Sequence, residues 1–286
     1  MNLRLDFPPL DNPRLMNRLT LATWNINSVR LRIDRVVAFL KREKPDVLCL
    51  QEIKCLEDQF PRKAFEAAGY KHIHLSGQKG MHGVAIVSKL PLELTAPPEF
   101  CMHGHARCAT AKIGGFEIHN LYVPAGADIP DPALNDKFAH KLDFIERMRE
   151  TYATRAGKRS APPLLVAGDI NIAPEENDVW SHKQLLDVVS HTPVETDGLK
   201  RILAEGKFMD IARAKHPANE KLYTWWSYRA ADWKLSNRGR RLDHWWADKK
   251  ATPLVDIASY RIITEERGGE KPSDHVPVMV SVTAPT

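Results

Sequence analysis

The order of apolar and polar positions predicts a chain in which short strands alternate with helices. Residues 19–25 (LTLATWN) and 46–52 (DVLCLQE) are apolar runs typical of buried strands. A helix is predicted between them, with Asn27 or Ser28 as its cap. Its apolar face consists of Leu31, Ile33, Val36, Val37 and Leu40.

The next hundred residues favour a sheet followed by a long helix. Short strands are predicted at 71–75 and 83–88, and then a hairpin in which ATAKI and FEIHNLYV flank the turn Gly114-Gly115. From Asn135 to about Thr154, apolar residues recur at three- and four-residue intervals, which predicts an amphipathic helix packed on a sheet. These residues are Phe138, Leu142, Ile145 and Met148.

The remaining elements complete one mixed α/β body. The run PLLVAGDIN (163–171) predicts a buried strand, and weaker patterns predict helices at about 181–190 and 196–213. A final pair of strands is expected to close the chain. Repeats, low-complexity tracts and linkers are not evident, so we expect a single domain over 16–286. Residues 1–15 carry three prolines and no periodicity, so either they form a loose N-terminal tail or Met16 is the natural start.

Composition narrows the class of protein. The formal net charge of +5 and the pI of about 8.9 are compatible with a polyanionic partner. Four irregularly spaced cysteines do not resemble a disulfide framework, which favours a reducing compartment. The chain also lacks an apolar run long enough to span a membrane and the apolar core of a signal peptide. We therefore expect a cytoplasmic protein without membrane contact.

Polar residues suited to metal or phosphate chemistry stand at the ends of most predicted strands. Unpaired buried carboxylates are costly, so such a set needs a cation or hydrogen-bond donors. Magnesium prefers oxygen ligands, which suits Glu52 with Asp274 or a neighbouring Asn25. The full set consists of Asn25, Glu52, Tyr122, Asp169, Asn171, Asp243, Asp274 and His275.

Each of these residues also has an ordinary structural explanation. Asp169 after a strand could cap a turn, and Asn25 could open the turn before the first helix. Tyr122 could be packed within a strand, and His275 could be a hydrogen-bonded core histidine. The functional hypothesis therefore rests on the set rather than on any one member.

Seven short motifs follow one another from Leu19 nearly to the end of the chain. They are WNINSVR, LCLQEIK, GQKGMHGVAI, LYVP, GDINIAP, SNRGRRLDH and KPSDHVPV. In this order they resemble the exonuclease III family of abasic-site endonucleases. The resemblance implies the four-layered α/β sandwich of DNase I-like proteins, in which two packed mixed β-sheets are flanked by helices.

The resemblance also implies roles for individual residues. Glu52 would be the principal metal ligand, with Asn25 and Asp274 close by. Asp169 would orient or deprotonate the attacking water, and Asn171 would donate a hydrogen bond to the scissile phosphate.

Further roles concern the phosphate and the strand that carries it. His275 would contact the phosphate while Asp243 holds its tautomer, and Tyr122 would contact the phosphate or stabilise developing charge. Lys137 and Arg107 match family positions near the DNA.

Residues 223–246 combine aromatic and cationic side chains, as a groove for a nucleic-acid backbone requires. The resemblance implies that Trp225 and Leu242 form the walls of a pocket for the base-free sugar, with Arg240 contacting a strand. Some of the tryptophans are equally expected in the core, namely Trp245 and one of Trp225 and Trp226.

Two features depart from the family pattern or compete with it. The run YVPAGA has Ala125 where the family usually carries Asn or Gln to contact a phosphate, so one hydrogen bond of roughly 1.5–3 kcal/mol should be missing. CMHGHARC places Cys101, His103 and His105 on one face of an extended strand, like zinc ligands. The spacing is not a usual zinc pair and falls in a variable loop of the family, so we do not predict a zinc site there.

The resulting hypothesis is a Mg²⁺-dependent DNA repair nuclease, with Mn²⁺ as a substitute, that cuts 5′ to abasic sites and also acts on 3′ ends. Its partner would be double-stranded DNA carrying abasic sites or 3′ ends. We expect a monomer without an obligate protein partner, cytoplasmic and associated with the nucleoid through DNA. The alternatives are a phosphodiesterase or phosphatase of the same fold, and a DNA-binding module with weakened catalysis.

Overall fold

The computed structural model describes residues 18–230 and 232–285, with 1–17, 231 and 286 left out. The predicted tail at 1–15 and the candidate start at Met16 lie outside the described residues. In the described part of the chain, the helices are too short or too polar to cross a membrane.

Two six-stranded mixed sheets pack face to face. The first has the strand order β13-β14-β1-β2-β4-β3, in which β1 is parallel to β2 and antiparallel to β14. Its strands are β1 (Arg18–Asn25), β2 (Val47–Gln51), β3 (His72–Ser76), β4 (Val84–Ser88), β13 (Val255–Ile262) and β14 (Val278–Thr283).

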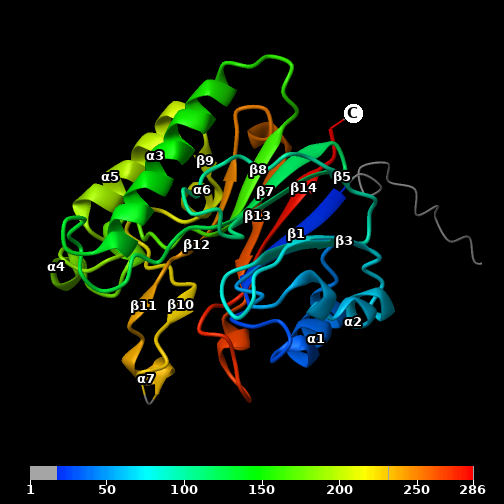
Figure 1. The fold of residues 1–286 in the computed structure, drawn as a ribbon, viewed down its shortest axis with the longest axis horizontal. Helices are drawn as coiled ribbons and strands as arrows, with labels where there is room; N and C mark the ends of the chain where they lie inside the picture. Colours follow the sequence, from blue (N-terminus) through cyan, green and yellow to red (C-terminus); the bar gives the residue numbers. More distant parts are fainter. Residues whose placement is uncertain (1–17, 231, 286) are drawn as a thin grey trace, which may run out of the picture.

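The second sheet has the order β5-β6-β7-β8-β12-β9, in which β7 and β8 are parallel and β12 is antiparallel to β8. Its strands are β5 (Glu93–Leu94), β6 (Cys108–Ile113), β7 (Phe116–Tyr122), β8 (Leu164–Asp169), β9 (Met209–Asp210) and β12 (Asp243–Ala247). A separate two-stranded ribbon, β10 (Trp225–Trp226) with β11 (Gly239–Arg240), projects from one end of the sandwich (Figure 1).

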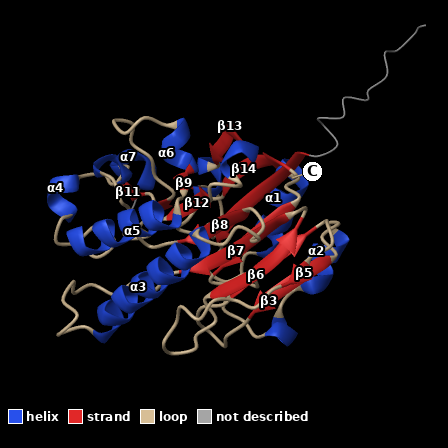
Figure 2. Ribbon diagram, turned by 90° about the horizontal axis from the view of Figure 1, so that it is seen from above, coloured by secondary structure: helices blue, strands red, loops and turns tan. Residues whose placement is uncertain are grey.

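Helices cover the outer faces of both sheets. Figures 1 and 2 show α3 and α5 packed side by side outside the second sheet, and α1 and α2 outside the first. The arrangement is the predicted four-layered sandwich. The helices are α1 (Ile33–Glu43), α2 (Arg62–Ala67), α3 (Asp136–Ala156), α4 (His182–Leu185), α5 (Pro193–Gly206), α6 (Ile211–Lys215) and α7 (Trp233–Ser236).

The strand period of two produces these layers. Along β8, Leu165 and Ala167 face the first sheet, whereas Leu164 and Val166 face the helices. The same alternation in β1 sends Leu21 to the core between the sheets. At the last residue of β1 and of β8, the position that faces the other sheet is polar. These residues are Asn25 in β1 and Asp169 in β8.

Gly168 is required at the position before Asp169. Its φ of +133° is unfavourable for other residues, and a Cβ there would lie 2.0 Å from the Leu121 carbonyl oxygen of β7. The close approach of β7 and β8 therefore depends on glycine, and it aligns Tyr122 with Asp169 in register.

Some predicted boundaries were wrong. The first helix begins at Ile33 after the N-cap Arg32, so neither Asn27 nor Ser28 caps it; both have positive φ in the preceding turn, and Leu31 is 57% exposed. The helix predicted over 196–213 starts at Pro193 and ends at Gly206, before β9 and α6. The one predicted over 181–190 is a single turn.

Arg241 anchors the loops at the base of the ribbon. Its guanidinium is fully buried, with Nε 2.7 Å from Asp178 Oδ1 and Nη2 2.8 Å from Asp210 Oδ2. Arg213 adds a second contact to Asp178, at 2.6 Å. Burial opposes ionisation of Asp178, but the attraction of Arg241 and Arg213 outweighs it and lowers its pKa. The folded state is therefore stabilised by the ionised carboxylate.

We expect Asp178→Asn to lower the free energy of unfolding by about 3 kcal/mol, because it leaves Arg241 with only Asp210 as a counter-charge. Because the folded pKa of Asp178 is depressed, its contribution is complete above the ordinary value of 3.8 and is lost as the pH falls through the folded pKa. The wild-type protein should thus lose more stability than the variant in that acidic range. Urea denaturation across pH measures both effects.

The matched control is Asp256→Asn, which breaks a solvent-exposed pair with Arg18 and should cost at most about 1 kcal/mol. Equal losses in the two variants would contradict the special role of the buried network.

Candidate active site

One cleft of about 950 Å³ collects most of the residues singled out from the sequence. It opens at the rim where the inward-facing positions of both sheets turn polar, beside the β10–β11 ribbon. Its walls include Glu52, Tyr122, Asp169, Asn171, Trp225, Arg240, Leu242, Asp274 and His275. Asn25 and Asp243 lie directly behind them, each hydrogen-bonded to a residue of the cleft.

Asp169 lies at the centre of this group. It is 1% exposed at the end of β8, and Asn25 Nδ2, from the other sheet, donates to its Oδ2 at 2.8 Å. Asn171 donates through its backbone N to Oδ1 at 3.0 Å and through Nδ2 to Oδ2 at 3.1 Å. Burial raises the pKa of Asp169 to about 7, although His275 opposes the shift. A carboxyl group with a pKa near neutrality can both accept and return a proton.

His275 is paired with two carboxylates. Its Nδ1 lies 2.8 Å from Asp243 Oδ2, and its Nε2 lies 3.7 Å from Asp169 Oδ2. Burial lowers the pKa of the imidazole, but the charges of Asp243 and Asp169 outweigh burial and raise it to about 10. The ring is therefore a cation at neutral pH.

Thr224 holds Asp243 in place and was not identified from the sequence. Its hydroxyl donates to Asp243 Oδ2 at 2.6 Å and accepts from the backbone N of Asp243 at 3.0 Å. A threonine gives no sequence signal for such a role, because the contact joins positions 19 residues apart.

Glu52 and Tyr122 form a second pair in the cleft. The Tyr122 hydroxyl donates to Glu52 Oε1, and Lys54 Nζ lies 2.9 Å from Oε2. Burial opposes ionisation of Glu52, but Lys54 and the tyrosine hydrogen bond lower its pKa. Burial and the nearby carboxylates raise the pKa of Tyr122, so the phenol keeps its proton. Glu52 follows β2 in the left-handed region, with φ of +51°, a strained conformation common at functional sites.

Asn27 links the three residues expected to bind a metal. Its backbone N donates to Asn25 Oδ1 at 3.0 Å, and its Nδ2 donates to Asp274 Oδ1 at 3.1 Å. Its own Oδ1 accepts from Lys54 Nζ at 2.6 Å, and Lys54 in turn pairs with Glu52. The sequence pattern pointed to Asn27 only as a helix cap, and Lys54 was not identified.

The donor set fits a hard divalent cation. Carboxylate and amide oxygens of Glu52, Asp274 and Asn25 are ligands of the kind that Mg²⁺ prefers. The Lys54 ammonium already lies against the oxygens of Glu52 and Asn27, so this rim attracts positive charge. Ligand atoms of Asp169, Asp243 and His275 also lie within 4.8 Å of one another, but there the imidazolium itself supplies the cation.

Two predicted DNA contacts lie outside the cleft wall. Arg107 is 6% exposed behind Tyr122, with its guanidinium 4.8 Å from the centre of the phenol ring and one N–H donated to the Tyr122 carbonyl oxygen. In this structure it supports Tyr122 instead of reaching solvent. Lys137 is exposed in the first turn of α3.

The predicted sugar pocket is an apolar corner of the cleft. Leu242 packs in a cluster that includes Trp225 and Trp180. Arg240 lies over the Trp225 ring at 5.3 Å, and its Nη1 donates to Ser190 Oγ at 2.7 Å. Trp245 and Trp226 are buried, which confirms that Trp245 and one of the adjacent pair belong to the core.

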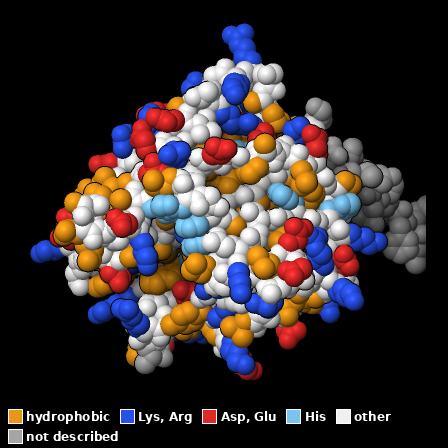
Figure 3. Space-filling model, viewed as in Figure 1, with side chains coloured by type: hydrophobic (Ala, Val, Ile, Leu, Met, Phe, Trp, Pro, Cys, Tyr) orange, Lys and Arg blue, Asp and Glu red, His pale blue; other side chains and the backbone are white. Residues whose placement is uncertain are grey.

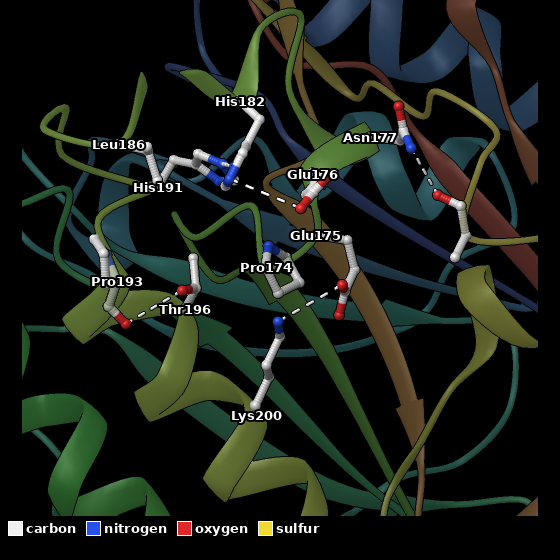
Figure 4. Close-up of a pocket in the computed structure, with 11 residues that line it drawn as sticks. Pro174, Glu175, Glu176, Asn177, His182, Leu186, His191, Pro193, Thr196 and Lys200 are labelled. Carbon is white, nitrogen blue, oxygen red and sulfur yellow. Dashed lines mark hydrogen bonds and ion pairs between the residues drawn. The ribbon is translucent and has the colours of Figure 1, made fainter. Parts of the chain in front are cut away.

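Another hollow, of about 350 Å³, lies between α4 and α5 and shares no lining residue with the cleft (Figure 4). His182 and His191 lie against each other on its wall, with His182 Nδ1 2.8 Å from His191 Nε2, and Lys200 pairs with Glu175 at its edge. The ionisable side chains His182, His191, Lys200 and Glu175 on its wall therefore already have partners in one another.

Known proteins are similar to this chain over most of its length. The model of the endonuclease/exonuclease/phosphatase family matches residues 22–275. Exodeoxyribonuclease III of Haemophilus influenzae is 30% identical over 269 residues, which cover 90% of this chain and 97% of that protein.

Two solved structures are also similar. An AP endonuclease from Archaeoglobus fulgidus superposes with a TM-score of 0.83 at 34% identity, covering 93% of this chain and 99% of that one. A 3′ phosphatase from Neisseria bound to product DNA hairpin gives 0.82 at 29% identity, covering 92% and 98%.

We expect Asp243→Asn to lower the pKa of His275 in the metal-free protein from about 10 toward its ordinary value or below, because burial then acts without the adjacent negative charge. NMR titration of the imidazole measures the shift. Asp210→Asn, which removes a carboxylate that contacts Arg241 but not His275, should leave it unchanged. An unshifted His275 in Asp243→Asn would contradict the assigned pairing.

Proposed function

The chain belongs to the endonuclease/exonuclease/phosphatase family, within its exonuclease III group of DNA repair nucleases, and we propose that it cleaves DNA on the 5′ side of abasic sites with Mg²⁺ as cofactor. The proposal extends to 3′ ends, where it would act as a 3′–5′ exonuclease and 3′-phosphodiesterase. The observation that carries it is the juxtaposition of the Asp169 carboxyl group and the His275 imidazolium in one cleft, 3.7 Å apart.

In the proposed reaction, Asp169 accepts a proton from a water molecule while the water oxygen forms a bond to phosphorus. The bond between phosphorus and the 3′ oxygen breaks, and that oxygen leaves as a hydroxyl group after taking up a proton from solvent water. Asn25 and Asn171 fix the carboxyl group through their hydrogen bonds. Proton transfer of this kind contributes about 10²–10⁴-fold to a rate.

Negative charge on the phosphoryl oxygens is stabilised by groups already aligned in the cleft. His275 presents Nε2–H because Asp243 holds Nδ1, and Tyr122 presents a protonated phenol. Glu52, Asn25 and Asp274 would hold Mg²⁺, which supplies further positive charge to the phosphate. Lys54 would then exchange its contact with Glu52 for solvent, as its partly exposed side chain allows.

Selectivity for abasic sites would come from the apolar corner of the cleft. Trp225 and Leu242 offer a surface for a deoxyribose, and the cationic Arg238 and Arg240 stack on Trp180 and Trp225 beside it. Such alternation of cations and rings suits a DNA backbone. Arg107 and Lys137 remain proposed positions near the DNA. We also propose that the protein acts as a monomer in the cytoplasm, with Mn²⁺ able to replace Mg²⁺.

Two rival activities use the same fold. A phosphodiesterase or phosphatase for another phosphate ester would not need the ribbon of rings and cations from Trp225 to Arg240. A DNA-binding module without catalysis would not need the paired His275 and Asp243. Both rivals are weaker accounts of this cleft.

The central test is a duplex with one tetrahydrofuran abasic analogue, incubated with protein and Mg²⁺. We expect incision on the 5′ side of the lesion that stops in EDTA, with a slower cut in Asp169→Asn and His275→Ala by about a hundredfold or more, since each removes one group from the reaction. Asp256→Asn, a surface carboxylate outside the cleft, should retain full activity. Tight binding without a cut would favour the binding module.

Ala125 provides a gain-of-function test. It is an exposed residue of the cleft wall, and only a methyl group occupies the place where the family has an amide. We expect Ala125→Asn to raise the incision rate about tenfold by adding a hydrogen bond to the phosphate. Ala127→Asn, two residues away on the same wall, is the control and should leave the rate unchanged. Equal rates in Ala125→Asn and wild type would show that another donor already serves that phosphate.

A further inference from the structure

A cluster of histidines and one cysteine lies beside the cleft but outside the proposed reaction. The loop after β5 carries Cys101, His103 and His105, and α3 supplies His140. The ring centroids of His103 and His140 are 4.5 Å apart, and those of His105 and His140 are 5.8 Å apart. Figure 3 shows histidine side chains gathered on this face, beside the N-terminal half of α3.

Three of these side chains converge on a common point. Ligand atoms of Cys101, His105 and His140 all lie within 4.8 Å of one another. A tetrahedral zinc site with bonds of about 2.0–2.3 Å separates its ligand atoms by roughly 3.5 Å, so only small side-chain movements are needed. Cys101 Sγ and His140 Nε2 are already 3.2 Å apart.

Hydrogen bonds within this cluster leave one ring nitrogen of His105 without a partner. Its Nδ1 is buried, and no partner for it is found among the described residues. An unpaired buried nitrogen is costly, and a metal ion is one partner that would satisfy it. The thiol–imidazole contact between Cys101 and His140 leaves that cost in place.

The imidazoles are in the protonation state that metal binding requires. Burial and the nearby Arg107 lower the pKa of His140 to about 4, against a small opposing effect of Asp143. Burial, Arg107 and His103 also lower the pKa of His105. Both rings are therefore neutral at pH 7, with a nitrogen lone pair free to bind a cation.

We propose that Cys101, His105 and His140 bind a borderline-soft divalent cation of the zinc class, at a site separate from the oxygen-ligand site of the cleft. The Cys101 thiolate offsets part of the positive charge beside Arg107. Water or the exposed His103 completes the tetrahedron. The ion ties the 101–107 loop to α3 and thereby fixes the segment that ends in Arg107, which packs on Tyr122.

The sequence does not predict this site, because CMHGHARC lies in a variable loop of the family and its ligand types are unusually spaced. Cys101, His103 and His105 have no usual zinc spacing, and the third ligand comes from a helix that begins 31 residues after His105. Chain folding, and not local spacing, assembles the ligand set.

Cobalt substitution tests the proposal without measuring activity. Metal-free full-length protein is titrated with Co²⁺ in excess Mg²⁺, which occupies the oxygen site and competes poorly for sulfur and nitrogen ligands. We expect about one equivalent of Co²⁺ to produce a thiolate-to-cobalt charge-transfer band, and Zn²⁺ to bleach it. The cleft cannot produce this band, because no cysteine lines it.

Cys101→Ser should abolish the band, and His105→Ala and His140→Ala should weaken Co²⁺ binding at least about tenfold, since even the loss of an outer partner of a ligand costs that much. Cys108→Ser and His182→Ala, outside the cluster, are the matched controls and should bind like the wild type. Circular dichroism confirms the fold of each variant, and the partly exposed His105 provides an independent test if Cys101→Ser is unstable. Absence of the band, its survival in Cys101→Ser, or its equal loss in the controls would overturn the proposal. None of these outcomes depends on cleavage of DNA.

Discussion

The hydrogen bond from Asn25 to Asp169 joins the two sheets at the point where the proposed chemistry takes place. Asn25 ends a strand of the first sheet and Asp169 ends a strand of the second. The pair His275–Asp243 crosses the same gap, and so does a deeper bond from Gln51 to Asn120 at 2.6 Å. Buried polar groups need partners, and here each sheet supplies partners for the other. The same buried hydrogen bonds therefore fix both the packing of the two sheets and the geometry of the cleft.

Charge pairing keeps this polar rim inside a folded protein. His275 is a cation because two carboxylates surround it, and Glu52 is an anion because Lys54 and Tyr122 contact it. A buried ion pair farther from the cleft also joins two elements. Lys141 Nζ of α3 lies 2.5 Å from Glu195 Oε1 of α5, and both side chains are fully buried. Lys141 also donates to the carbonyl oxygen of Asn171 at 2.8 Å, so the outer helices hold the loop after β8. The helical layer thus contributes to the position of Asn171 as well as to the core.

Residue type alone does not decide where a side chain lies. Arg240 and Arg241 are adjacent and chemically identical, yet Arg240 lies on Trp225 beside the cleft and Arg241 is buried between Asp178 and Asp210. Asn27 suits a helix cap by type, but it serves as a bridge among the oxygen groups near Lys54. Residue type gives the chemistry that a side chain can perform, whereas its partners come from strands and loops far away in the chain.

The sequence by itself predicted most of the longer strands, the main helices and the polar residues at the strand ends, because alternation of apolar positions is a local property. The resemblance of its short motifs to a known family predicted the fold class. The sequence did not predict the short strands β5, β9, β10 and β11, or the strand β12 that carries Asp243. Only the tertiary structure decided that Asp169 lies beside His275, that Arg107 packs behind Tyr122, and that His140 joins Cys101 and His105. Those relations depend on how two twisted sheets and their covering helices pack. Packing sums many weak contacts over the whole chain, so a local pattern cannot specify which distant side chains finally meet.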